Sequence, residues 1–174
     1  IVLKNPYELL VNIAEGVFSK NNISKWIGIV INIPFFILSQ IIIFKLVYAI
    51  TKDIKQGLLS ICVYGFSSVA LGFSIYTRFY TLALFLILLA FYLHYRIWNS
   101  KSLVKGFFYE IIAFISLYYS FKCSELAAVI AVSIFICFAF ALLIRKRYRQ
   151  FFIYISPGIL GGFYVIDYSG VLGD

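Results

Sequence analysis

Arg78 stands in a short link between two strongly apolar runs of the sequence, flanked by Tyr76 and Tyr80. If both runs cross a membrane, the link holds the Arg78 guanidinium at the edge of the hydrocarbon, where a charge is costly unless it is paired or hydrated. A guanidinium is a planar fork of donors that matches phosphate oxygens. The segment therefore predicts a phosphate site at headgroup depth. The alternative is that Arg78 extends to lipid headgroups and the tyrosines form an interfacial belt.

Secondary candidates lie in two other segments. The turn of residues 118–125 holds Lys122 and Glu125, which either pair with each other or add a second cation and a carboxylate beside the first candidate site. Near the N-terminus, Glu8, Asn12 and Glu15 recur on one face of an expected helix. That face is either simply solvated or part of the same site.

The residue inventory excludes several kinds of chemistry. No C-x-x-C pair occurs among the three cysteines, and a structural zinc site needs about four Cys or His ligands, so we expect no zinc site and assign no metal ligand. The chain has neither G-x-x-x-x-G-K-[ST] nor G-x-G-x-x-G, the loops that bind soluble nucleotides. His94 is the only histidine and stands beside Arg96, where we expect no specific role. Glu110 lies inside an apolar run; a proton relay is one interpretation, but we expect it to reach Lys105 or water.

The elements that carry these residues are membrane spans. The chain is 63% hydrophobic and 13% charged, whereas soluble domains are about half apolar and about a quarter charged. Residues 26–44, 57–75 and 126–144 contain no charge, and each run matches the roughly 20 residues that cross a bilayer as a helix. We expect an all-α, polytopic bundle with about six spans, near 26–44, 57–75, 79–95, 106–121, 126–144 and 150–166, in a single domain of residues 1–174.

The positive charges indicate topology rather than nucleic-acid binding. Most of the Lys and Arg residues behind the net charge of +8 fall in the links after the first, third and fifth runs. Positive loops stay in the cytoplasm, so both ends of the chain are expected to face the extracytoplasmic side. The residue usage is typical of an AT-rich bacterial gene, which favours a bacterial inner membrane.

The first 25 residues predict an interfacial helix. Asn5 can cap it, Pro6 suits its first position, and Glu8 occupies the capping-box position. Apolar residues then recur at spacings of three and four, as an amphipathic helix requires. We expect this helix to lie along the outer membrane surface.

The order of these features resembles the polyprenyl-phosphate-sugar-dependent integral membrane glycosyltransferases of the GT-C class, which include protein mannosyltransferase-like and aminoarabinose-transferase-like enzymes. Their Ser-x-x-x-Arg-x-Tyr segment is matched by Ser74, Arg78 and Tyr80. Their Pro-Pro-Leu-Tyr-Tyr-like helix is matched in part by Pro6-Tyr7. Their Leu-Tyr-Thr-His-Tyr-like span end is similar to residues 117–121, with the His absent.

The resemblance implies transfer of a hexosyl or pentosyl group from a lipid phosphate carrier to a glycan, lipid or protein acceptor, outside the membrane. Arg78 would contact the donor phosphate, framed by Tyr76 and Tyr80. The family's catalytic acid follows its first span, and we expect it upstream of Ile1 in a longer protein. No catalytic residue is then assigned here, and the chain alone should be inactive. The lipid-linked sugar takes the place of a soluble cofactor, and a divalent metal is left open.

Two other functions fit a polytopic chain. A transporter or flippase subunit places ionisable groups near mid-membrane and breaks helices in paired halves. Mid-span charges are nearly absent here, which counts against it. A non-catalytic membrane scaffold is the third interpretation.

Overall fold

The computed structural model describes residues 6–17, 24–75, 79–100, 102–123 and 125–156. All regular structure in these ranges is helical, which confirms the all-α prediction. The helices are α1 (Pro6–Val17), α2 (Ser24–Thr51), α3 (Ile54–Gly65), α4 (Ser68–Ile75), α5 (Tyr80–Asn99), α6 (Leu103–Cys123) and α7 (Glu125–Ile144), followed by a helix at 148–156.

Three helical segments are long and apolar enough to cross a membrane: Ile27–Thr51, Tyr80–Asn99 and Leu103–Cys123. Large apolar side chains such as Ile37, Leu59, Ile112 and Phe140 are exposed on the outside of the helices. Soluble monomers rarely expose apolar patches of this kind, whereas lipid chains would cover them. The chain thus has the surface and the helix lengths that an integral membrane protein needs.

The segment 57–75 does not form the single continuous helix that its apolar run predicts. α3 ends at Gly65, where the Phe66 N–H bonds the Cys62 carbonyl at 2.9 Å, and α4 begins at Ser68. Glycine and serine have low helix propensity, which weakens the helix at this point. A Cβ on Gly65 would lie 3.0 Å from the Gln40 side chain of α2, so the break also sits at a close helix contact.

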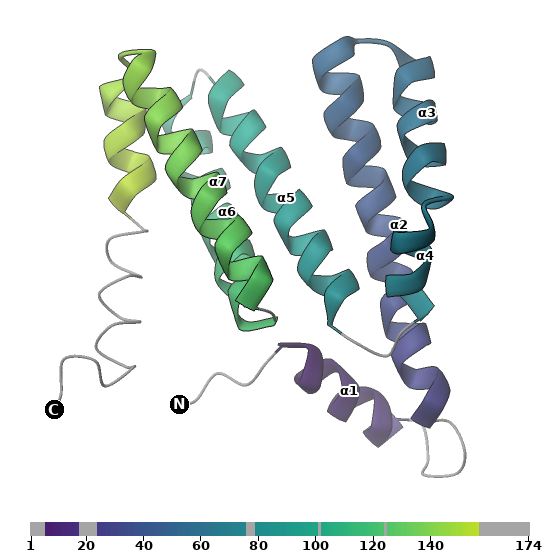
Figure 1. Ribbon diagram of the computed structural model, residues 1–174. Coiled ribbons are helices and arrows are strands. Elements are labelled where there is room, and N and C mark those ends of the chain that lie inside the picture. The colour runs from purple at the N-terminus through teal and green to yellow at the C-terminus, as the bar shows by residue number, and fades with distance from the viewer. Residues whose placement is uncertain (1–5, 18–23, 76–78, 101, 124, 157–174) are drawn as a thin grey trace, which may run out of the picture.

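Three connections lie at one end of the bundle: α2 to α3, α5 to α6, and α7 to the helix 148–156. α1 lies across the other end (Figure 1). We call these the basic end and the α1 end. The basic end carries the Lys- and Arg-rich links, which the alternating charge pattern predicts to share one side. Which side of a membrane each end faces stays a prediction.

α5 is the central helix. It packs against α2, α6 and α7, and its contact with α6 is the most extensive in the bundle. Small residues mark these contacts: Ala90, Ala113 and Ala131 are buried, which allows the backbones to approach closely. α3 packs on α2 through Gly57, whose Cβ, if present, would lie 2.7 Å from the Phe44 ring.

Among the described residues α1 begins at Pro6, and its buried side is anchored by Tyr7. The outer side is mixed rather than polar, because Leu9 and Ile13 are exposed together with Glu8 and Asn12.

Candidate functional site

The sequence-predicted site falls partly outside the described residues. Tyr76 and Arg78 lie in the link 76–78, which is outside the described residues. Glu125 begins α7, but its side chain is not among those that the structure describes. Tyr80 begins α5, half-buried, with its ring 4.8 Å from that of Phe79.

The other two predicted residues are on neighbouring helices. Lys122 lies in the last turn of α6, with its ammonium 5.8 Å from the centre of the Tyr118 ring. Glu8 is exposed in the first turn of α1.

The helices that carry these residues meet at the α1 end. One buried cluster joins Tyr7 of α1, Leu82 and Ala83 from the start of α5, Cys123 from the end of α6, and Ala127 of α7. Burial raises the pKa of Tyr7, and the interaction of its hydroxyl with the Asn32 side chain of α2 opposes that rise. The α1 end is therefore a packed junction of five helices, and Tyr80, Lys122 and Glu8 border it.

A second polar group, which sequence reasoning dismissed, lies inside the bundle. His94 of α5, Glu110 of α6 and Tyr154 of the helix 148–156 are exposed by 2%, 2% and 1%. The sequence predicts no specific role for His94, but its ring is enclosed and hydrogen-bonded. Of the two partners expected for Glu110, Lys105 is not supported, because Lys105 is exposed and Glu110 is buried; water stays a prediction.

The hydrogen bonds of His94 fix its tautomer when the ring is neutral. Nδ1 lies 2.6 Å from the Ala90 carbonyl oxygen, and a carbonyl only accepts, so Nδ1 carries the hydrogen. Nε2 then has a free lone pair, and the Tyr154 hydroxyl donates to it at 2.8 Å. The Phe135 carbonyl oxygen lies 3.3 Å from the same hydroxyl and is a second acceptor for it.

Aromatic rings enclose this hydrogen-bonded pair. The Phe138 ring centre lies 4.8 Å from that of His94 and 5.0 Å from that of Tyr154. The Phe135 ring stacks on Tyr154 at 4.8 Å. Aromatic packing of this kind keeps bulk water away and holds both polar side chains in place.

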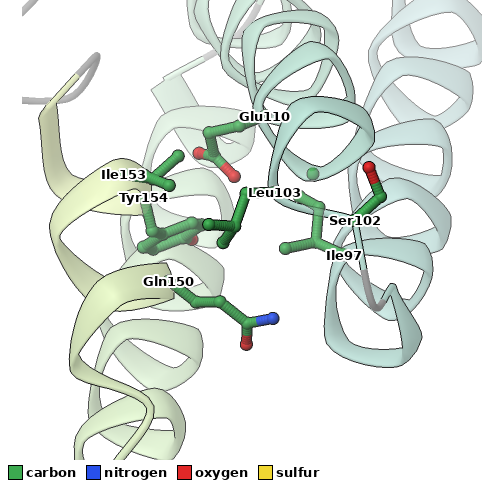
Figure 2. A pocket seen from close by; sticks show the side chains of 8 residues that line it. Ile97, Ser102, Leu103, Glu110, Gln150, Ile153 and Tyr154 are labelled. Atoms are coloured by element: carbon green, nitrogen blue, oxygen red, sulfur yellow. The ribbon is translucent and has the colours of Figure 1, made fainter.

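Glu110 faces a small cavity of about 10 Å³, which is about the minimum volume for one water molecule. The cavity is also lined by the side chains of Ile97, Ser102, Leu103, Gln150, Ile153 and Tyr154 (Figure 2). Among the described residues, Oε2 of Glu110 has no hydrogen-bond partner. An ionised carboxylate is costly to bury without partners, so this oxygen calls for a water molecule or a proton.

Polar contacts join two connections at the basic end, next to the cavity residues Ser102 and Gln150. Arg147 donates to the Trp98 carbonyl oxygen at 2.6 Å and to Gln150 Oε1 at 3.3 Å. Gln150 in turn donates to the Ser100 carbonyl oxygen at 3.4 Å. The guanidinium of Arg147 also lies 5.2 Å from the centre of the Trp98 ring, a cation–π distance.

The pairing register of the helical hairpins could have indicated this buried polar group from the sequence. In an antiparallel helical hairpin, residues equally far from the turn lie side by side. His94 and Glu110 are equally far from Ser102, at the α5–α6 turn, and Phe138 and Tyr154 are equally far from Lys146, at the turn after α7. The two hairpins therefore bring the polar residues to one level of the bundle.

Within the ranges that the structure describes, no three His, Cys, Asp or Glu side chains are grouped so that they could hold a metal ion. No protein family, no curated protein and no solved structure matches the chain.

Proposed function

We propose that this chain is part of a membrane glycosyltransferase, which moves a sugar from a polyprenyl-phosphate carrier to an acceptor on the extracytoplasmic face. One observation supports this most: the helices that carry Tyr80, Lys122 and Glu8 converge at the α1 end, and Tyr80 follows Arg78 by two residues in the sequence. A lipid-borne phosphate needs polar groups at the edge of an apolar bundle, and this junction offers them.

The proposed topology has about six spans in a bacterial inner membrane, with the α1 end outside. α1 lies along the outer surface in this arrangement. Its exposed Leu9 and Ile13 reach the acyl boundary, while Glu8 and Asn12 meet water. A donor that diffuses within the bilayer then reaches the Arg78 link from the side.

The proposed chemistry divides between this chain and the rest of the protein. An acidic residue upstream of Ile1 takes the proton of an acceptor hydroxyl, whose oxygen then attacks the anomeric carbon. The new glycosidic bond forms as the bond from that carbon to the carrier phosphate oxygen breaks. Arg78 stabilises the negative charge that the departing phosphate gains.

Arg78→Ala in the full-length protein tests the assignment. We expect loss of transfer from a panel of polyprenyl-phosphate sugars, with unchanged membrane insertion. Arg149→Ala is the matched control, because Arg149 is an exposed arginine at the basic end. Normal turnover by the Arg78 variant would overturn the proposed role.

A transporter or flippase subunit is the second candidate, and buried Glu110 favours it. Ionisable groups within membrane helices commonly mark transport pathways. The sequence upstream of Ile1 discriminates the two. One span followed by an outer loop with Asp or Glu supports the transferase, whereas several spans without such a loop support the transporter.

A further inference from the structure

The contacts of His94 allow two complete hydrogen-bond arrangements. With the ring neutral, Nδ1–H donates to the Ala90 carbonyl and the Tyr154 hydroxyl donates to Nε2. With the ring protonated, Nε2–H donates to the Tyr154 oxygen, and the Tyr154 hydroxyl turns to the Phe135 carbonyl, 3.3 Å away. Both arrangements satisfy every donor without movement of a helix. We infer that His94, Tyr154 and Glu110 form a proton-binding site inside the bundle.

The carboxylate of Glu110 supplies the charge that such a site needs. A protonated imidazole among phenylalanine rings is costly unless a negative group is near. Glu110 and Tyr154 line the same cavity, and Tyr154 also contacts His94, so the tyrosine connects the acid to the base. Glu110, whose Oε2 has no hydrogen-bond partner among the described residues, lines this shared space.

The proton comes from a hydronium ion at the cavity, which has room for about one water molecule. It binds the Tyr154 oxygen as the proton of that hydroxyl passes to His94 Nε2, so Tyr154 stays neutral. The added proton becomes the Tyr154 O–H that donates to Phe135. A hydronium ion becomes water, and no other bond changes.

The remaining ionisable groups of the surrounding helices do not compete for this role. The following are exposed: Lys45, Tyr48, Arg96, Lys105, Cys137, Tyr148 and Arg149. Tyr92 and Tyr109 accept hydrogen bonds from Arg96, and Tyr95 donates to the Ala49 carbonyl oxygen. Of the described groups, Tyr154 contacts His94 directly, and Glu110 lines the cavity that Tyr154 also lines.

His94 is the only histidine in this sequence, so ¹⁵N-histidine labelling in this chain reports on one ring. The experiment uses the full-length protein in lipid bilayers, with any histidine outside this chain replaced, and records the ring nitrogens by solid-state NMR from about pH 4 to about pH 9. We expect the Nδ1–H tautomer at high pH and a doubly protonated ring at low pH.

Glu110→Gln removes the compensating charge but keeps the side-chain size. We expect the proton-binding equilibrium constant of His94 to fall at least about tenfold, since a nearby opposite charge has an effect of this order. Lys105→Gln, an exposed change on the same helix, should leave the titration as it is.

A ring that keeps one protonation state across the whole range would overturn the site, as would identical titration in wild type and Glu110→Gln. If that variant does not fold, infrared spectra of the wild type decide. A carboxylate band that persists while His94 gains its proton supports the charge pairing, and a protonated carboxyl band already present where the ring is neutral refutes it. Neither readout requires sugar transfer, so failure here leaves the proposed function standing, and the reverse also holds.

Discussion

Replacing Tyr154 with Phe should destabilise the protein by about 1–2 kcal/mol. The substitution removes one hydroxyl and keeps the ring stacked on Phe135 and tilted against Phe138. Nε2 of His94, in a side chain that is 2% exposed, then has no donor. Leaving a buried polar group unsatisfied costs about 1–3 kcal/mol of stability. The free energies contributed by hydrogen bonds between membrane helices lie at or below the lower part of that range.

Unfolding of the full-length protein in mixed micelles, followed by circular dichroism, measures this loss. Tyr148→Phe is the matched control on the same helix, because Tyr148 is 54% exposed and its free energy of unfolding should change by less than about 0.5 kcal/mol. A double-mutant cycle with His94→Phe isolates the pair, with an expected coupling of about 1 kcal/mol. Equal stability of the Tyr154 and Tyr148 variants, together with zero coupling, would refute the hydrogen bond and the site built on it.

Two further predictions concern packing and topology. Gly57→Ala should lower the free energy of unfolding by about 1–3 kcal/mol, because the new Cβ would lie 2.7 Å from the Phe44 ring. Gly106→Ala is the control: a Cβ at that position would meet nothing within 4 Å, so the change should be neutral or stabilise the protein by up to about 1 kcal/mol. A thermal unfolding series in which Gly106→Ala is less stable than Gly57→Ala would contradict this packing. In a cysteine-free background, an impermeant maleimide should label Lys52→Cys and Glu8→Cys from opposite sides of the membrane, since the basic end and the α1 end lie apart (Figure 1). Labelling of both from one side would contradict the arrangement.

Much of the helical order could be predicted from apolar runs and caps. The run 79–95 became α5, which extends to Asn99, and the run 106–121 became α6, which ends at Cys123. These predictions held because a long apolar segment has few alternatives to a helix when it faces lipid. The predicted cap of α1, Asn5, lies outside the described residues.

The break between α3 and α4 was not predictable from hydropathy alone. Residues 57–75 are uncharged throughout, so composition indicates one span. The interruption depends on local Gly and Ser content and on the approach of Gln40 from another helix, which becomes visible only once α2 and α3 are paired.

The buried polar group was missed for a related reason. In the sequence His94 lies near the charged Arg96, and Glu110 lies near a basic turn. Taken separately, each residue is typical of the membrane–water interface. Their burial depends on which faces of α5, α6 and the helix 148–156 meet, and that follows from hairpin register rather than from local sequence. The predicted site at Arg78 stays a prediction.

Sugar transfer by the full-length protein in proteoliposomes tests the central proposal most directly. A panel of radiolabelled polyprenyl-phosphate sugars is supplied in the bilayer, and an envelope extract is supplied as acceptor on one side at a time. The proposal predicts label in the acceptor fraction only when the acceptor meets the α1 end, and its loss in Arg78→Ala but not in Arg149→Ala. Absence of transfer from every donor, or transfer that Arg78→Ala leaves intact, would contradict it.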